Sequence, residues 1–144
     1  MAEAVTLVDS IVKAQRRKFM QTNRYAEGFE GLDVSPKGAT GMDYHTKGDP
    51  RTGRGGNGFR INLDWSGFTS GAVSAFREFN GRYDDSSLQY QYVLRREYQS
   101  DNVTCVGWNV AGQELCADFC GIDTPVRRCC NDGTRDSCPD PTNN

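Results

Sequence analysis

Six cysteines are the residues of this sequence best suited to chemistry, and all of them lie in its last 40 positions. Their spacing is C-x10-C-x3-C-x8-C-C-x7-C, and the residues are Cys105, Cys116, Cys120, Cys129, Cys130 and Cys138. Zinc sites usually contain CxxC pairs, which are absent here. An even set of six therefore favours three disulfides and an oxidising compartment.

The sequence alone leaves the pairing of these cysteines open. Cys129 and Cys130 are neighbours, so each is expected to bond to a more distant cysteine. A Cys105–Cys116 bridge is sterically reasonable, because Cys105 lies in a predicted strand and Cys116 in the predicted helix after it. Residues 122–144 are too poor in apolar side chains to form a core alone, so this segment needs such cross-links.

The other candidate groups give little support for catalysis. His45 is the sole histidine, which excludes mechanisms that need two imidazoles. Asp84 and Asp85 lie in a predicted turn, where a solvated hairpin tip is favoured over an acid–base pair. No phosphate-binding or nucleophile motif occurs. We therefore assign no catalytic residue and predict that the protein is not an enzyme.

Oxygen ligands for a metal are concentrated in one short polar segment. Asn131, Asp132 and Asp136 lie there, and the segment resembles a calcium loop. It lacks the spaced acids and the terminal glutamate of an EF-hand. A simple turn is the favoured interpretation, calcium is the alternative, and no other metal or cofactor is predicted.

The charge balance does not favour a nucleic-acid partner. Lys and Arg number 17 against 19 Asp and Glu, for a formal net charge of -2, whereas duplex-DNA binders usually carry a basic excess. The RTGRGG tract resembles an RNA-binding repeat, but one copy is weak support. Tyr90, Tyr92, Arg95 and Arg96 suggest a binding face on a strand, although packing of the tyrosines against a helix is the favoured interpretation.

The hydropathy pattern predicts a single domain, residues 1–144, of the α+β class. Residues 1–22 are expected to form a long amphipathic helix, since apolar side chains recur at three- and four-residue steps. Its core-facing stripe is Val5, Val8, Ile11, Val12 and Phe19. Residues 23–58 are expected to form a loop between helix and sheet, because the part after residue 34 contains seven glycines and two prolines.

Alternation of apolar and polar residues then predicts strands near 59–65, 72–79, 88–98 and 103–108. Short connections favour an antiparallel meander of three to four strands within residues 59–108, with one face packed on the helix. Residues 109–144 are expected to form a cysteine-rich, disulfide-stapled region with a short helix ended by Gly121.

The order of these elements resembles the soluble headpiece of a type IV pilin or of a type II secretion pseudopilin. The closest local likeness is EAVTLVDSIVKAQRRKFMQTNRYAEGFEGLDV, Glu3 to Val34. Many pilins have such a helix, then an N-x-x-Y-like helix end and an F-x-x-L-D-hydrophobic segment. The matching residues here are Asn23, Arg24, Tyr25, Phe29, Leu32, Asp33 and Val34. The stretch VTCVGWNVAGQELC, Val103 to Cys116, resembles the family's strand–cysteine–helix–cysteine ending.

The resemblance implies a structural subunit of an extracellular type IV pilus, serving adhesion, motility or a related surface role. The family's leader and apolar N-terminal helix are absent from this sequence, which implies a truncated, monomeric form of a longer protein. That protein would enter the inner membrane, meet the pilus assembly machinery and polymerise with other subunits through the missing helix. Six cysteines exceed the single bridge that is common in the family.

Two alternatives remain open beside the pilin. A type II secretion pseudopilin would share the fold, and calcium at residues 131–136 would favour it, whereas the six cysteines argue against it. A small exported, disulfide-rich module that binds a surface ligand or DNA is the other. Calcium-dependent stability would indicate the first, and salt-dependent DNA affinity would indicate the second.

Overall fold

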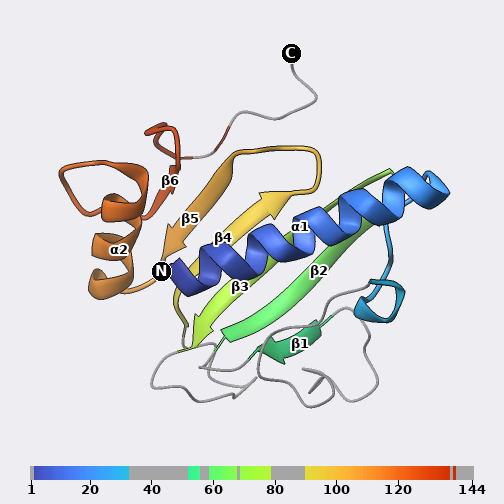
Figure 1. The fold of residues 1–144 in the computed structure, drawn as a ribbon. Helices are drawn as coiled ribbons and strands as arrows, with labels where there is room; N and C mark the ends of the chain where they lie inside the picture. Colours follow the sequence, from blue (N-terminus) through green and yellow to red (C-terminus); the bar gives the residue numbers. More distant parts are fainter. Residues whose placement is uncertain are drawn as a thin grey trace.

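The computed structural model describes residues 2–32, 52–55, 59–67, 69–78, 90–136 and 138. Along these residues the elements are α1 (Ala2–Thr22), the short 3-10 helix η1 (Phe29–Gly31), β1 (Thr52–Gly55), β2 (Phe59–Gly67), β3 (Ser70–Glu78), β4 (Tyr90–Glu97), β5 (Val103–Gly107), α2 (Val110–Cys120) and β6 (Arg128–Cys130). Figure 1 shows α1 lying across the sheet, with α2 near its N-terminal end. The α+β class predicted from the sequence is confirmed.

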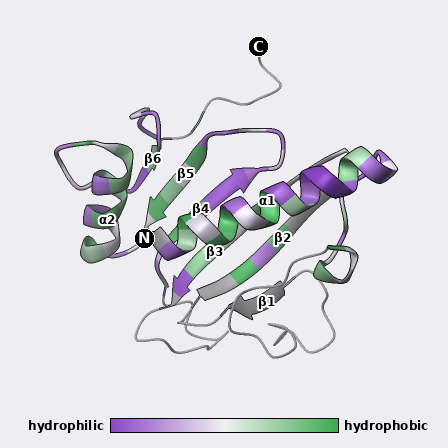
Figure 2. Ribbon diagram, in the orientation of Figure 1, coloured by the Kyte–Doolittle hydropathy of each residue, from purple (hydrophilic) through white to green (hydrophobic). Residues whose placement is uncertain are grey.

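α1 forms because an uninterrupted amphipathic run can bury one stripe against the sheet. Val8, Ile11 and Val12 are buried, whereas Val5 and Phe19 are partly buried and pack against the same core. The helix is followed by Asn23, whose positive φ of 59° is a conformation that Asn tolerates well. Figure 2 shows that hydrophilic residues are prominent in the C-terminal half of α1.

A buried glutamine fixes the chain where it turns back after α1. Gln15 is fully buried, its Nε2 donates to the Ala26 carbonyl oxygen over 3.0 Å, and its Oε1 accepts from the Ala26 nitrogen over 2.8 Å. The pair of bonds satisfies both ends of the buried amide. Tyr25 and Phe29, on either side of Ala26, are thereby held in the core beneath the helix.

The described strands form one antiparallel sheet in the order β1-β2-β3-β4-β5-β6. The predicted meander is confirmed, but the prediction of three to four strands was too low. β1 lies in the stretch predicted to be loop, and β6 lies in the cysteine-rich region. Their sequences, TGRG and RCC, show no alternation that hydropathy could detect. Backbone pairing with β2 and β5 makes them strands.

One face of the sheet carries an unbroken row of buried side chains. Its successive cross-strand partners, each 0 % exposed, are Ile61, Ala75, Leu94, Cys105 and Cys129. Arg96, two residues after Leu94 on β4, donates to Asp9 of α1 and so identifies this face as the one under the helix. The core therefore continues from β2 as far as β6.

α2 is a short helix with a polar cap at its start and a glycine at its end. The side chain of Asn109 accepts a 2.7 Å hydrogen bond from the Gly112 nitrogen, and the predicted terminator Gly121 has a φ of 73°. A Cβ atom at Gly112 would overlap the Gln91 carbonyl oxygen. Glycine is thus the residue that lets the backbone of α2 approach β4 so closely.

All six cysteines are joined in three disulfides, Cys105–Cys116, Cys120–Cys129 and Cys130–Cys138. Such a density of cross-links is typical of exported proteins, which fold in oxidising compartments. Within the part of the chain that the structure describes, no helix is both long enough and apolar enough to cross a membrane.

Candidate functional site

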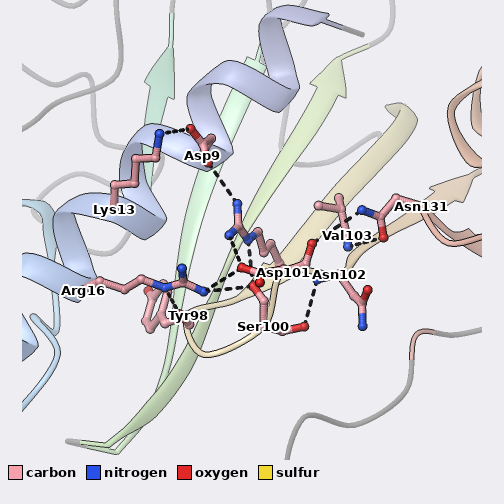
Figure 3. A network of polar contacts seen from close by, with 10 residues as sticks. Asp9, Lys13, Arg16, Tyr98, Ser100, Asp101, Asn102, Val103 and Asn131 are labelled. Carbon is pink, nitrogen blue, oxygen red and sulfur yellow. Dashed lines mark hydrogen bonds and ion pairs between the residues drawn. The ribbon is translucent and has the colours of Figure 1, made fainter.

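A polar network joins α1 to the turn between β4 and β5, as Figure 3 shows. At its centre is Arg96 on β4, whose side chain is only 12 % exposed. Its Nη1 donates to Asp9 Oδ1 over 3.1 Å, its Nη2 to Asp101 Oδ1 over 3.2 Å, and its Nε to the Ser100 carbonyl oxygen over 2.8 Å. The guanidinium group therefore contacts both the helix and the turn.

Arg16 makes the reverse connection, from the helix to the same turn. Its Nε donates to the Tyr98 carbonyl oxygen over 2.7 Å, and its Nη2 lies 3.3 Å from both the Ser100 carbonyl oxygen and Asp101 Oδ1. Both guanidinium groups thus share two acceptors, Ser100 O and Asp101 Oδ1. Charge-assisted hydrogen bonds of this kind are stronger than neutral ones and fix direction as well as distance.

Asp9 is the acceptor on α1, and the network lowers the pKa of its carboxyl. The 2.9 Å contact with Lys13 Nζ, one turn later, lowers the pKa of the Asp9 carboxyl below its usual value. Partial burial opposes this shift, and the bond from Arg96 adds to it. The carboxylate therefore stays charged down to acidic pH and remains a partner for both cations.

The network continues to the segment after β6 through Asn131. Its side-chain Oδ1 accepts from the Val103 nitrogen over 3.1 Å, its own nitrogen donates to the Val103 carbonyl oxygen over 3.0 Å, and its Nδ2 lies 3.5 Å from the Asp101 carbonyl oxygen. Hydrogen bonds thereby join α1, the β4–β5 turn and the segment after β6, which are distant from one another in sequence. The arrangement suits a structural clamp, because its charged groups are bonded to one another.

The disulfides attach α2 to the sheet in a regular geometry. Cys116 and Cys120 are four residues apart and so lie on one face of α2, while Cys105 and Cys129 are direct cross-strand partners. The bonded pairs have Cα–Cα distances of 5.5 Å for Cys105–Cys116 and 6.2 Å for Cys120–Cys129. Two adjacent positions on the helix thus meet two adjacent positions on the sheet, and the structure contains the Cys105–Cys116 pair that the sequence favoured.

The neighbouring cysteines of β6 bond in different directions. Side chains alternate between the two faces of a strand, so Cys129 points toward α2 and Cys130 points away from it. Cys130 is bonded to Cys138, with a Cα–Cα distance of 5.0 Å. Each of the two neighbours therefore bonds to a more distant cysteine, as the sequence led us to expect.

The three calcium candidates are exposed and lie in one turn after β6. Asn131 Oδ1 is already bonded to the Val103 nitrogen. Asp132 Oδ1 accepts a 2.8 Å bond from the Thr134 nitrogen, and hydrogen bonds from Thr134 lower the pKa of its carboxyl. Asp136 donates its backbone nitrogen to the Arg128 carbonyl oxygen. Among the described residues no group of three or more His, Cys, Asp or Glu side chains is arranged to hold a metal, and calcium stays a prediction.

The tyrosine- and arginine-rich strand is used mainly inside the molecule. Tyr92 is 2 % exposed, and burial raises the pKa of its hydroxyl. Arg96 belongs to the network, and Arg95 is partly buried. The side chain of Tyr90 lies outside the described part of the structure. His45, Asp84 and Asp85 also lie outside the described residues. Of the RTGRGG tract, only the four residues of β1 are described.

The network is the feature that sequence reasoning missed, although one signal for it was present. On β4 the residues Tyr92, Leu94 and Arg96 alternate on the face that packs under α1. A charged side chain at such a position needs a partner. The acids available on the facing helix include Asp9, which already stands four residues before Lys13. Asp101 and the Ser100 carbonyl oxygen could not be inferred, because a turn brings them there.

Comparison of the chain with protein-family models, with curated proteins and with solved structures finds no match.

Proposed function

We propose that the chain is the headpiece of a structural subunit of an extracellular type IV pilus. The observation that carries this proposal is the 21-residue helix α1, which packs one stripe on an antiparallel sheet and keeps its other side polar. A C-terminal region closed by disulfides accompanies it. This combination of elements agrees with the local likeness to pilins at residues 3–34 and 103–116.

In this proposal the native protein carries an apolar helix ahead of α1. That helix would anchor the subunit in the inner membrane before assembly and would pack against other subunits in the filament core. The domain that α1 and the sheet form would lie outside that core, exposed to the environment, where disulfides stabilise it against unfolding and proteolysis. The clamp of Arg16 and Arg96 would keep α1 fixed to the sheet while the helix is loaded by its neighbours.

The proposal is tested by labelling filaments on the source cells. Antibodies raised against residues 1–144 are expected to decorate surface filaments, along their length for a major subunit or at sparse sites for a minor one. Deletion of the gene should abolish either the filaments or this labelling. Antigen found only inside the cells, with filaments unchanged and unlabelled, would contradict the proposal.

A calcium-binding pseudopilin of type II secretion is the second candidate. The observation that favours it is the exposed turn after β6, where Asp132 keeps its carboxylate charged. In that case calcium would raise the melting temperature of the domain and a chelator would lower it. Asp132→Asn should remove this response. Equal melting temperatures with calcium and with chelator would leave the pilin as the better assignment.

A further inference from the structure

The C-terminal half of α1 and the segment that contains α2 carry charges of opposite sign. From Lys13 to Arg24 the sequence contains five cations and no acid, whereas from Asn109 to Val126 it contains three acids and no cation. Figure 1 shows α2 near the N-terminal end of α1, while the C-terminal half of α1 extends away from it. One molecule therefore carries a basic stripe and an acidic stripe in different places.

The basic stripe consists of Lys13, Arg17 and Met20, which follow steps of four and three residues and so share one side of α1. All three are exposed: the side chain of Lys13 is 64 % accessible, and Met20 is 84 % accessible. Met20 is the most exposed large apolar residue of the described structure. The stripe thus combines two cations with one exposed apolar side chain.

The acidic stripe consists of Val110, Glu114 and Asp118, which are spaced four residues apart and share one side of α2. All three are exposed, and Val110 is 70 % accessible. The stripe again combines two charges of one sign with one exposed apolar side chain. The side of α2 that bonds to the sheet carries Cys116 and Cys120, so the stripe is free to face outward.

The two stripes match when the helices are antiparallel. Four residues of α-helix rise about 6 Å and three rise about 4.5 Å. With Arg17 opposite Glu114, an antiparallel α2 brings Asp118 opposite Lys13. The same register places Val110 within about 1.5 Å, along the axis, of Met20. Two ion pairs and one apolar contact would thus form together in a single register.

We propose that this face of α1 in one copy of the chain packs antiparallel against this face of α2 in a second copy. Each copy that uses its basic stripe in one contact keeps its acidic stripe for another, so the contact is heterologous and can extend a row of subunits. Lys13 already contacts Asp9, and Arg17 also has an interaction within its own chain, but interactions of exposed charged side chains are weak and do not prevent a second acid from approaching. The contact rests on the proposed filament function, since it would join neighbouring subunits of the filament. Its test, however, needs only this domain.

The contact predicts weak, salt-sensitive self-association of the domain. Amide resonances along the two stripes should shift with protein concentration between about 0.05 and about 1 mM, because a dissociation constant near 1 mM corresponds to an association free energy of only about 4 kcal/mol. Raising NaCl from about 0.02 to about 0.5 M should weaken the association roughly tenfold, because exposed charges are screened. Concentration-independent spectra at low salt would overturn the proposal.

Charge reversal with mixing is the decisive experiment. Lys13→Glu with Arg17→Glu gives a variant with two acidic stripes, and Glu114→Lys with Asp118→Lys gives one with two basic stripes. Each variant alone should lose self-association by at least roughly tenfold, and an equimolar mixture should regain it. Self-association that survives in either variant alone, or a mixture that stays monomeric, would overturn the proposal.

Matched controls separate this contact from a general effect of net charge. Arg127→Glu with Arg135→Glu changes the net charge as much as the first variant does, but at exposed positions outside both stripes. This control should associate like the unaltered domain. Should a reversal variant fail to fold, Met20→Ser and Val110→Ser each test the apolar contact without altering charge, and each should weaken the association.

The filament proposal and this contact can fail separately. Unlabelled filaments together with successful mixing would leave the contact standing without the pilus. Labelled filaments together with failed mixing would leave the pilus standing without this contact.

Discussion

α1 and α2 cover the same face of one sheet, yet they are attached by different means. α1 has 21 residues and buries an apolar stripe that includes Val8, Ile11 and Val12. α2 has 11 residues, and those it buries are Gly112, Cys116, Ala117 and Cys120. A long helix can be held by apolar contact area alone. A short one whose buried residues are small is held by covalent bonds and by close backbone approach.

The polar network lies between α1 and the β4–β5 turn, and it adds directional hydrogen bonds to the apolar packing of α1. Apolar packing is non-directional, whereas Arg96 and Arg16 donate hydrogen bonds to fixed acceptors. Asn131, next to Cys130, extends these hydrogen bonds to the disulfide-bonded region. Apolar area, cross-links and directed hydrogen bonds therefore have separate roles in this fold.

The largest effect is expected in the region held by apolar packing. Leu94 is 0 % exposed in the middle of the sheet beneath α1, so Leu94→Ala should lower the free energy of unfolding by about 3 to 5 kcal/mol. Urea denaturation with the disulfides intact measures this loss. Val110→Ala, at a 70 % exposed position, should change it by less than about 0.5 kcal/mol. A loss for Leu94→Ala no larger than that of the control would contradict the packing.

Removal of the buried bridge tests the other region. Cys105→Ser with Cys116→Ser should cost about 2 to 4 kcal/mol, and the loss should fall on α2 and β6. Hydrogen exchange should show lost protection of the amides of α2 while those of α1 keep most of theirs. An unchanged melting temperature, or a loss of protection that begins in α1, would be the opposite of this expectation.

A substitution at Gly112 tests whether the backbone of α2 lies as close to β4 as the structure shows, because close approach and helix propensity have opposite effects on stability there. In a free helix Gly→Ala stabilises by about 1 kcal/mol, but here the added methyl would meet the Gln91 carbonyl oxygen. Gly112→Ala should therefore destabilise the domain by about 1 to 3 kcal/mol. Ala111→Ser at the exposed neighbouring position is the control, with little change expected. Stabilisation by Gly112→Ala would show that α2 does not lie so close to β4.

Arg96→Met removes the directed bonds and keeps most of the apolar stem. It should cost about 1 to 2 kcal/mol, because Asp9 and the Ser100 carbonyl oxygen lose a charged donor. Thermal unfolding measures the change, and Arg135→Met, at an exposed position, should be nearly neutral. If both substitutions have the same effect, the network does not stabilise the attachment of α1.

The smallest expected effect is the contribution of Asp9 to the pH dependence of stability. The folded-state pKa of Asp9 lies below its usual value of 3.8, chiefly because of the bond to Lys13. Its stabilising contribution is therefore complete above the unfolded-state pKa and is lost as pH falls through the lower, folded value. Asp9→Asn should make stability less dependent on pH below about 4. Melting curves between pH 2 and pH 6 that remain parallel to those of the unaltered domain would refute this role.

The sequence predicted the parts of the fold that have a periodic pattern. α1, the strands around Ile61 and Leu94, and the helix that Gly121 terminates follow from hydropathy and capping. β1 and β6 did not, because TGRG and RCC become strands only when a neighbour supplies hydrogen bonds.

The candidate site was less predictable than the fold. Six cysteines predicted the disulfides, but the choice among pairings needed the register that places Cys105 opposite Cys129. Only Arg96 and its acceptor Asp9 were predictable in the network. The other acceptors, the Ser100 carbonyl oxygen and Asp101 Oδ1, lie in a turn that the hydropathy pattern does not define.

We propose that this domain belongs to a filament subunit. The most direct test is the intact mass and N-terminal sequence of the protein isolated from its source cells. We expect a chain longer than this one, with an apolar helix ahead of α1 and a processed first residue. A mature protein that begins at or near Met1 would contradict the claim and would favour an exported binding module.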